Sequence, residues 1–436
     1  LERKELFKRV LRYNDINDED EGLQVVRIAQ ISCGTEYSGI QKEIEKAAKL
    51  VGGNIFVPEV EASEIKVVED DFGFHVLSPG LRVMMARAKA IGEGRADADG
   101  VFITSCFKCA EGALVRSIIR RYIQSHTKIP VVTYSFTERT KAGALMLRME
   151  ALVDIIGKKP LFARTKQEGL TAGIDSGSTT TKAVIMKDNE IIGVGWLPTT
   201  GVIESGEQAM NAALNEAKVT LDKLEGIGVT GYGRKILRER YNAQLAMEEV
   251  STCSKGALYM TDKQRGDATV IDIGGMDNKA VTLYDSIPDS FTVGGVCAGA
   301  SGRFLETSAK RLGVELDEFG EMAFRGDYTS VPMNAYCIVF GLQDLVAGLA
   351  SGAKLEDVAA AACHSVAEQI FEQQLQEIDI RYPIIEVGST ALLRGLVKAM
   401  SDILSVDIIV PQRPNLIGAV GAALMVSGIK ELEEKK

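Results

Sequence analysis

The chain has 436 residues, which is long enough for two or three domains that each bury a core. Its net charge of −10 and the lack of a basic stripe argue against a nucleic-acid partner, and no apolar run is long enough to cross a membrane. Seven cysteines, an odd number, argue against a disulfide framework, so we expect a cytoplasmic protein with free thiols, metal ligands or redox centres.

Residues 1–22 hold a short basic amphipathic piece and then an acidic run, which we interpret as a solvated arm. From residue 23 to about residue 160, strand-like and helix-like patterns alternate with short connections. The predicted strands are Val25–Ile31, Asn54–Val57, Gly100–Thr104 and Ile129–Tyr134. This alternation predicts an open, mostly parallel α/β domain. Lys159–Glu168 is then interpreted as a polar linker.

Three cysteines of this first domain follow predicted strands. Cys33 comes directly after the first strand, and Cys106 and Cys109 come after the third. Because the carboxyl ends of parallel strands share one edge of a sheet, the three thiols could converge on one site. An iron–sulfur cluster or a redox thiol pair is one interpretation, and ordinary buried cysteines are the other.

A phosphate-binding hairpin is predicted at Leu170–Val184, where an apolar strand ends in Asp175, a turn follows and a second strand returns. A glycine in the turn lets the backbone approach a phosphate closely, and the hydroxyls and amides around it can donate to phosphate oxygens. Asp175 is placed to hold Mg²⁺ through water. The residues predicted to bind the nucleotide are Ser176, Gly177, Ser178 and Thr179, with Lys182 near them.

The same chemistry recurs at Ala268–Val281, where a strand ends in Asp272, Gly274 and Gly275 form the turn, and the chain returns behind Lys279. Two Asp-ended hairpins predict two similar halves that close on one nucleotide. A third element, Ile384–Gly395, is a strand that leads through Gly388 and Ser389 into a helix suited to the adenosine side. In this order the three elements resemble the two-lobed ATPase fold shared by sugar kinases, Hsp70 and actin. We expect this ATPase module at residues 169–436, with lobe I at about 169–258 plus the C-terminal segment and lobe II at about 266–410.

Two further cysteines stand at the mouths of predicted helices. Cys297 lies in a glycine-rich turn before a helix that runs to about Leu312, and Cys337 precedes a second helix. Helix N-termini favour thiolates and an anionic cluster. Two cysteines cannot complete the four ligands of a [4Fe–4S] cluster, but a symmetric homodimer would supply four.

At these residues the C-terminal part resembles the BadF/BadG/BcrA/BcrD ATPase family, the activators of 2-hydroxyacyl-CoA dehydratases and ATPase subunits of benzoyl-CoA reductases. The resemblance rests on Cys297–Phe304 (CAGASGRF), Cys337–Phe340 (CIVF), Thr230–Arg234 (TGYGR) and the two hairpins. It implies that Cys297 and Cys337 bridge a [4Fe–4S] cluster between two protomers. It also implies that ATP hydrolysis drives one low-potential electron, drawn from a reduced ferredoxin- or flavodoxin-like donor, into a partner enzyme.

The sequence departs from the family pattern in two places. Met276 stands where the family usually has Gln in its D-I-G-G-Q-D motif, and Gly388-Ser389 replaces a glycine pair. The added N-terminal domain with its SCG and SCFKC motifs makes the whole chain similar to the methanogenesis marker family numbered fifteen. That similarity implies a role near the reductive activation of methyl-coenzyme M reductase.

Two other functions fit the same ATPase fold. One is a small-molecule kinase in which Cys297 and Cys337 are packing residues, although the sequence offers no separate carboxylate as its base. The other is a nucleotide-gated binding protein with negligible turnover, and Met276 is the best support for it.

Overall fold

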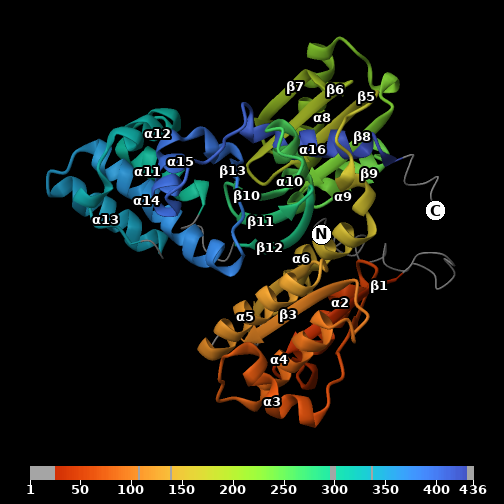
Figure 1. Ribbon diagram of the computed structural model, residues 1–436. Coiled ribbons are helices and arrows are strands. Elements are labelled where there is room, and N and C mark those ends of the chain that lie inside the picture. Colours follow the sequence, from red (N-terminus) through yellow and green to blue (C-terminus); the bar gives the residue numbers. More distant parts are fainter. Residues whose placement is uncertain (1–24, 107–108, 138–139, 295–300, 335–336, 430–436) are drawn as a thin grey trace, which may run out of the picture. The chain divides into compact units, whose positions relative to one another are not determined.

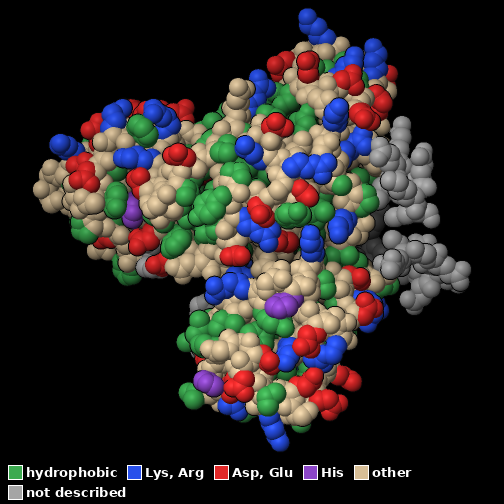
Figure 2. Space-filling model, viewed as in Figure 1, with side chains coloured by type: hydrophobic (Ala, Val, Ile, Leu, Met, Phe, Trp, Pro, Cys, Tyr) green, Lys and Arg blue, Asp and Glu red, His purple; other side chains and the backbone are tan. Residues whose placement is uncertain are grey.

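The computed structural model describes residues 25–106, 109–137, 140–294, 301–334 and 337–429 (Figure 1). The arm predicted at residues 1–22 lies outside these described residues, as does Cys297. The chain divides into two compact units after Gly157. None of the described helices is both long enough and apolar enough to cross a membrane. On the face shown in Figure 2, acidic and basic side chains are interspersed over both units.

Unit 1, up to Gly157, contains a parallel sheet with the strand order β4-β3-β1-β2. Its strands are β1 (Val26–Ser32), β2 (Gly53–Phe56), β3 (Gly100–Cys106) and β4 (Val131–Phe136). Its helices are α2 (Ile40–Lys49), α3 (Ala62–Phe72), α4 (Pro79–Gly92), α5 (Ala110–His126) and α6 (Ala142–Gly157), with a 3₁₀ turn η1 (Thr35–Tyr37) after β1. The predicted parallel α/β fold is confirmed.

Both faces of the unit 1 sheet are covered, which explains the nearly continuous apolar runs of its strands. Ala29 and Ile31 pack into a core shared with α4 and α5. Ile28, on the opposite face of β1, lies beside Gly53 on β2 and Val153 on α6. The sequence analysis did not include α3, whose apolar stripe is short: Val68 is buried, and Ile65 and Phe72 pack partly buried against the same core.

Lobe I of unit 2 is a five-stranded sheet in the order β7-β6-β5-β8-β9, with helices on both faces. The strands are β5 (Leu170–Ser176), β6 (Thr180–Lys187), β7 (Glu190–Pro198), β8 (Gly226–Gly231) and β9 (Leu245–Ala246). The helices are α8 (Val202–Ala217), α9 (Arg234–Tyr241) and α16 (Ile417–Val426), with a 3₁₀ turn η2 (Leu221–Lys223). Although α16 comes late in the chain, it lies against the lobe I sheet (Figure 1), where Ala419 and Ala423 share a core with Val184 and Met186.

The four strands of lobe II have the same topology as β7, β6, β5 and β8 of lobe I. Strands β12, β11 and β10 pair antiparallel, and β13 pairs parallel with β10. The strands are β10 (Asp267–Ile273), β11 (Asn278–Tyr284), β12 (Ile287–Val293) and β13 (Ile384–Val387). The helices are α11 (Gly302–Leu312), α12 (Leu316–Arg325), α13 (Ile338–Ala350), α14 (Leu355–Gln373) and α15 (Arg394–Leu404), and the 3₁₀ turns are η4 (Tyr328–Ser330), η5 (Leu375–Glu377), η6 (Ser389–Leu392) and η7 (Pro414–Leu416). Helix α10 (Glu249–Met260) contacts strands of both lobes.

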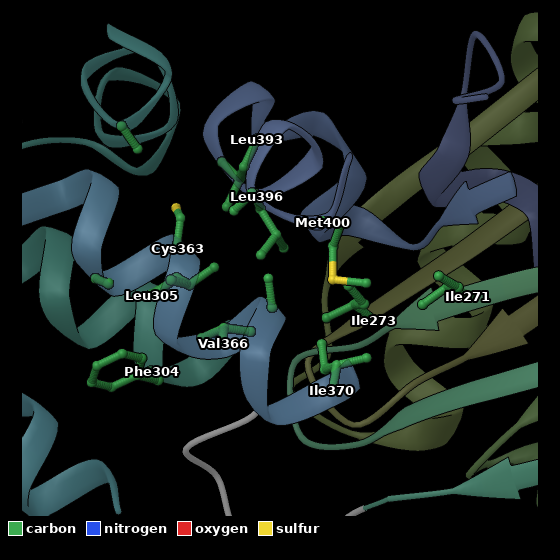
Figure 3. Packing of buried hydrophobic residues seen from close by; sticks show 14 of the residues in the cluster. Ile271, Ile273, Phe304, Leu305, Cys363, Val366, Ile370, Leu393, Leu396 and Met400 are labelled. Atoms are coloured by element: carbon green, nitrogen blue, oxygen red, sulfur yellow. The ribbon is translucent and has the colours of Figure 1, made fainter. Parts of the chain in front are cut away.

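The core of lobe II is built between its sheet and its helices (Figure 3). Ile273 from β10 meets Ile370 from α14 and Met400 from α15, and all three side chains are fully or almost fully buried. Cys363 of α14 lies in this apolar cluster, so it is a packing residue.

The sequence predicts a polar linker at Lys159–Glu168, but this segment is part of unit 2 and packs within it. It contains α7 (Lys159–Ala163), in which Leu161 and Phe162 are buried. The buried Lys255 ammonium of α10 donates to the carbonyl of Phe162 at 2.7 Å. The segment is mostly polar in sequence, but two of its apolar side chains are buried.

Candidate active site

The two predicted hairpins form with the same register. In the first, Asp175 of β5 is paired with Lys182 of β6. In the second, Asp272 of β10 is paired with Lys279 of β11. Each turn is closed by one backbone hydrogen bond, from Gly177 N to Thr180 O at 3.1 Å and from Gly274 N to Asp277 O at 2.8 Å. The hairpins are therefore two copies of one structure.

A glycine stands beside each aspartate on the neighbouring parallel strand. Gly231 ends β8 with φ +86°, and a Cβ there would lie 2.8 Å from Asp175 Oδ1. Gly388 follows β13 with φ +94°, and its Cβ would lie 2.8 Å from Asp272 Oδ1. Both positions need glycine, because the backbone is left-handed and a side chain would meet the carboxylate. Gly388 was predicted on the adenosine side, and the structure places it beside the second aspartate, followed by Ser389 at the start of η6.

The turns of the two hairpins touch. A Cβ on Gly275 would lie 2.5 Å from the Thr179 hydroxyl, so the second turn packs directly against the tip of the first. Ser178 and Thr179 are exposed at this tip, as is Met276 with 46% of its surface. Ser176 is fully buried and its hydroxyl has no hydrogen-bond partner among the described atoms. Most of the residues predicted to bind phosphate therefore lie around one point between the lobes.

The electrostatics of the site combine buried carboxylates with buried lysines. Lys182 Nζ lies 3.3 Å from Asp175 Oδ2. Burial raises the pKa of Asp175 and of Asp272, while the facing lysines oppose this shift. Such carboxylates gain from a divalent cation, and oxygen donors are the ligands that Mg²⁺ prefers.

Glu249, the first residue of α10, completes the charged cluster, and the sequence analysis gave it no role. Its Oε2 lies 2.6 Å from Nζ of Lys279, whose side chain is only 2% exposed. Burial alone would lower the pKa of Lys279, but the carboxylates of Glu249, Asp277 and Asp272 raise it well above its usual value. The only local sign of this role in the sequence is an acidic residue in the first turn of a helix. Acidic residues are common at helix N-termini, so this position does not stand out.

Cys253, one turn further along α10, also faces these carboxylates. It hydrogen bonds to Asp272, and burial, together with the charges of Asp272, Asp175 and Glu249, raises the pKa of the thiol well above its usual value. Cys253 is therefore a supporting residue that contacts Asp272.

The second hairpin is hydrogen bonded to helix α11. Gly302 N donates to Gly274 O at 2.9 Å, and Arg303 N donates to Gly275 O at 3.1 Å. Because Gly302 and Arg303 are the first residues of α11, these bonds tie the N-terminus of the helix to the turn at Gly274 and Gly275. Cys297, which precedes α11, lies outside the described residues.

Cys337 is the N-cap of α13, and its backbone N–H is held by the side chain of Asn334 at 2.9 Å. Helix α13 packs against α11. Cys337 is partly exposed, and its side chain makes no capping hydrogen bond. The thiol is thus available at the start of a helix, as predicted.

In unit 1 the thiols of Cys33, Cys106 and Cys109 are partly exposed and are not in disulfides. Burial raises the pKa of Cys33, and the neighbouring thiols of Cys109 and Cys106 raise it further. Within the described residues, no three His, Cys, Asp or Glu side chains are arranged to hold a single metal ion.

The repeated strand order and the paired hairpins define the class: unit 2 has the two-lobed ATPase fold shared by actin, Hsp70 and sugar kinases, as predicted. Residues 172–426 match the model of the BadF/BadG/BcrA/BcrD ATPase family, and the chain belongs to this family.

An uncharacterized protein of Methanocaldococcus jannaschii is 61% identical over 406 residues, which are 93% of this chain and 98% of that protein. The 2-hydroxyisocaproyl-CoA dehydratase activator of Clostridioides difficile is 31% identical over 256 residues, which are 58% of this chain and 93% of the activator. A solved structure of the activator of the 2-hydroxyisocaproyl-CoA dehydratase from Clostridium difficile, with bound ADPNP, has a TM-score of 0.55 to this chain at 28% identity. The match covers 61% of this chain and 98% of that one.

Proposed function

We propose that this protein is an ATP-hydrolysing reductive activator that delivers a low-potential electron to a partner metalloenzyme. The observation that carries the proposal is the pair of hydrogen bonds from Gly302 and Arg303 of α11 to the phosphate turn at Gly274 and Gly275. These bonds couple the nucleotide site to the helix that follows Cys297. Relatives that are activators of CoA dehydratases support the same role.

In this proposal Asp175 and Asp272 hold Mg²⁺, directly or through water, between the two hairpins. The turn amides and hydroxyls of Ser176–Thr179 and of Gly274 and Gly275 bind the β- and γ-phosphates, with Lys182 nearby. Gly388 and Ser389 approach the nucleotide from β13. These assignments use the buried carboxylates, whose pKa burial raises despite the facing lysines, and the unpartnered Ser176 hydroxyl described above.

We assign to Glu249 the role of orienting the water that attacks the γ-phosphate. It belongs to α10, which contacts both lobes, and its negative charge acts on both Asp175 and Asp272. Lys279 lowers the pKa of Glu249 against the effect of burial, so the carboxylate stays ionised and can accept a hydrogen bond from water. Glu249 thus gives the site a carboxylate in addition to Asp175 and Asp272.

The donors in the second half of the module fit an iron–sulfur cluster. Cys337 offers a partly exposed thiol at a helix N-terminus, where an anionic centre is favoured. Cys337 and Cys297 of two chains would hold one [4Fe–4S] cluster, and such a cluster supplies the low-potential electron. Hydrolysis would move α11 through its bonds to the phosphate turn and thereby change the surroundings of Cys297.

An exposed apolar stripe on α13 supports the homodimer that this cluster requires. Val339, Phe340 and Val346 are 65%, 55% and 48% exposed, and they follow Cys337 on the first turns of the helix. Exposed apolar residues at helical spacing indicate an interface. Because the stripe begins at the cysteine, we assign it to a second copy of the chain, related by a two-fold axis through the cluster.

The electron acceptor is proposed from the relatives. A 2-hydroxyacyl-CoA dehydratase-like enzyme is one candidate, since characterised relatives activate such dehydratases. Activation of methyl-coenzyme M reductase is the other, and it rests on the resemblance of the whole chain to the methanogenesis marker family numbered fifteen. A reduced ferredoxin- or flavodoxin-like protein would be the donor.

The test is anaerobic purification followed by iron and sulfide analysis, EPR and ATP turnover, for the wild type, Cys337→Ala and Cys297→Ala. We expect a dimer with a cluster signal that changes with ATP and is lost in both variants. A dimer that hydrolyses ATP, but whose signal and iron content are the same in wild type and variants, would contradict the assignment to these two cysteines. ATP turnover without any iron would favour the kinase alternative, and nucleotide binding with neither iron nor turnover would favour the binding protein.

A further inference from the structure

The three thiols of unit 1 leave the sheet at one edge. Strands β1 and β3 are adjacent and parallel, with Ser32 paired with Thr104, and each strand runs into a Ser-Cys pair. Cys33 follows Ser32, and Cys106 ends β3. The register therefore brings these two cysteines off neighbouring strands at the carboxyl edge, where α/β sheets bind their ligands.

Cys109 lies beside the end of β3. Its backbone N–H donates to Cys106 O at 3.2 Å. Cys109 is also the N-cap of α5, and its Sγ accepts a hydrogen bond from Gly112 N at 3.1 Å. A Cβ on Gly112 would lie 2.8 Å from this sulfur, so a larger residue would displace it. The Cys109 sulfur thus lies at the N-terminus of a 17-residue helix, and the backbone N–H of Gly112 is directed toward it.

Two buried arginines fix the strand ends that carry these thiols. Arg87 of α4 donates to Ser32 O at 3.1 Å and to Glu36 at 2.6 Å. Arg116 of α5 donates to the hydroxyl of Ser105 at 2.9 Å and to that of Ser135 on β4. Charged side chains are seldom buried unless they have such partners, and here the partners are the residues next to Cys33 and Cys106. Both strand ends are thus hydrogen bonded to helices of unit 1.

We propose that Cys33, Cys106 and Cys109 hold an iron–sulfur cluster in unit 1. The ligands of a cluster surround a body of several atoms and are spaced more widely than the ligands of one ion, which is compatible with thiols that do not converge on a single point. Three protein thiolates leave the fourth position of a [4Fe–4S] cluster to a non-protein ligand. The proposal is independent of the ATPase site and of the Cys297 and Cys337 pair.

The test uses the full-length chain with Cys297→Ser and Cys337→Ser together, so that the cluster of unit 2 is removed. The protein is purified anaerobically, reconstituted with ferrous iron and sulfide, and measured for iron, acid-labile sulfide and EPR after reduction. We expect iron and sulfide to remain in this double variant. Adding Cys33→Ser, Cys106→Ser or Cys109→Ser should remove them, whereas adding Cys363→Ala should not.

Nucleotide binding and thermal unfolding of each variant show that the fold is intact. A folded double variant without iron and sulfide would overturn the proposal. So would an iron content in the added Cys33, Cys106 and Cys109 variants as high as in the double variant itself. Stoichiometric zinc in place of iron, under the same conditions with zinc supplied, would also overturn it. Loss of the ATPase activity alone would not bear on the unit 1 cluster, because the cluster measurements need no nucleotide.

Discussion

Lys279 and Glu249 are joined by a buried ion pair of 2.6 Å that links the hairpin of lobe II to the helix between the lobes. The pair holds the carboxylate of Glu249 near both aspartates of the site. It also neutralises a lysine whose side chain is 2% exposed. The pair is therefore part of the charge balance of the nucleotide site as well as of its geometry.

Glu249→Gln should impair hydrolysis more than binding. If Glu249 orients water, its loss should lower kcat for ATP by about a hundredfold or more, because a positioned base typically contributes that much. Affinity for a non-hydrolysable ATP analogue should change little. The measurements are steady-state turnover and calorimetric binding, with the exposed Glu239→Gln on α9 as the control. An unchanged kcat would remove Glu249 from the mechanism.

Lys182→Met should destabilise the fold, because it leaves Asp175 buried without its cation. Removing one partner of a buried pair costs about 3 kcal/mol or more, and protonation of Asp175 would recover part of this cost. Urea unfolding at neutral pH measures the difference. Lys187→Met is the matched control, since Lys187 ends the same strand and is exposed. Equal unfolding midpoints for the two variants would show that the pair adds no stability.

Gly231→Ala and Gly388→Ala should weaken nucleotide binding as well as stability. In each, the new Cβ meets a carboxylate oxygen of the site at 2.8 Å. Gly266→Ala is the matched control, because Gly266 also has a positive φ, of +78°, but its Cβ would face open space. We expect the control to cost about 1 kcal/mol in backbone strain with normal binding. If all three variants bound Mg²⁺-ATP equally well, the contact with the aspartates would be unimportant.

Phe340→Asp should convert the proposed dimer into a monomer, since it places a charge in the exposed apolar stripe of α13. Sedimentation velocity under anaerobic conditions measures the oligomeric state. Leu221→Asp, at a similarly exposed leucine in lobe I, is the control and should leave the dimer intact. A dimeric Phe340→Asp variant would place the interface elsewhere.

Glu386 should make stability fall as pH rises. Both carboxyl oxygens are buried on β13 without a hydrogen-bond partner among the described atoms, and burial raises the pKa of Glu386 to about 8 from the ordinary 4.5. The unfolded chain ionises this group near pH 4.5, whereas the folded chain keeps it protonated until about pH 8. The unfolded state therefore binds fewer protons in this interval, so the free energy of unfolding decreases with pH across it.

Glu386→Gln should abolish that slope and stabilise the protein at pH 8 by a few kcal/mol. The measurement is the urea-unfolding free energy between pH 5 and pH 8.5. Glu321→Gln, at a surface carboxylate that pairs with Arg394, is the comparison and should keep the wild-type slope. Parallel pH profiles for wild type and Glu386→Gln would show that this carboxyl is not protonated in the fold.

Much of the fold followed from local patterns. The unit 1 strands were predicted within a few residues, because apolar runs bounded by short connections indicate buried parallel strands. Helix α3 and the packing of Lys159–Glu168 were harder to predict, because both segments are rich in polar residues. In α3 only Val68 is fully buried, with Ile65 and Phe72 partly buried beside it, and in the second segment only Leu161 and Phe162 are buried. In both cases two or three buried side chains decide the structure, which is a weak signal in the sequence.

The sequence by itself determined the two hairpins and the pairing of each aspartate with its lysine, because a short turn sets the register of the strands that it joins. It also determined the edge at which Cys33 and Cys106 emerge, since parallel strands share their direction. Only the tertiary structure decided that Glu249 reaches Lys279, that Gly388 lies beside Asp272, and that α11 is bonded to the phosphate turn. These contacts join segments far apart along the chain, so no local pattern predicts them. Strand pairing and helix packing within lobe II, and the position of α10 against both lobes, bring the segments together.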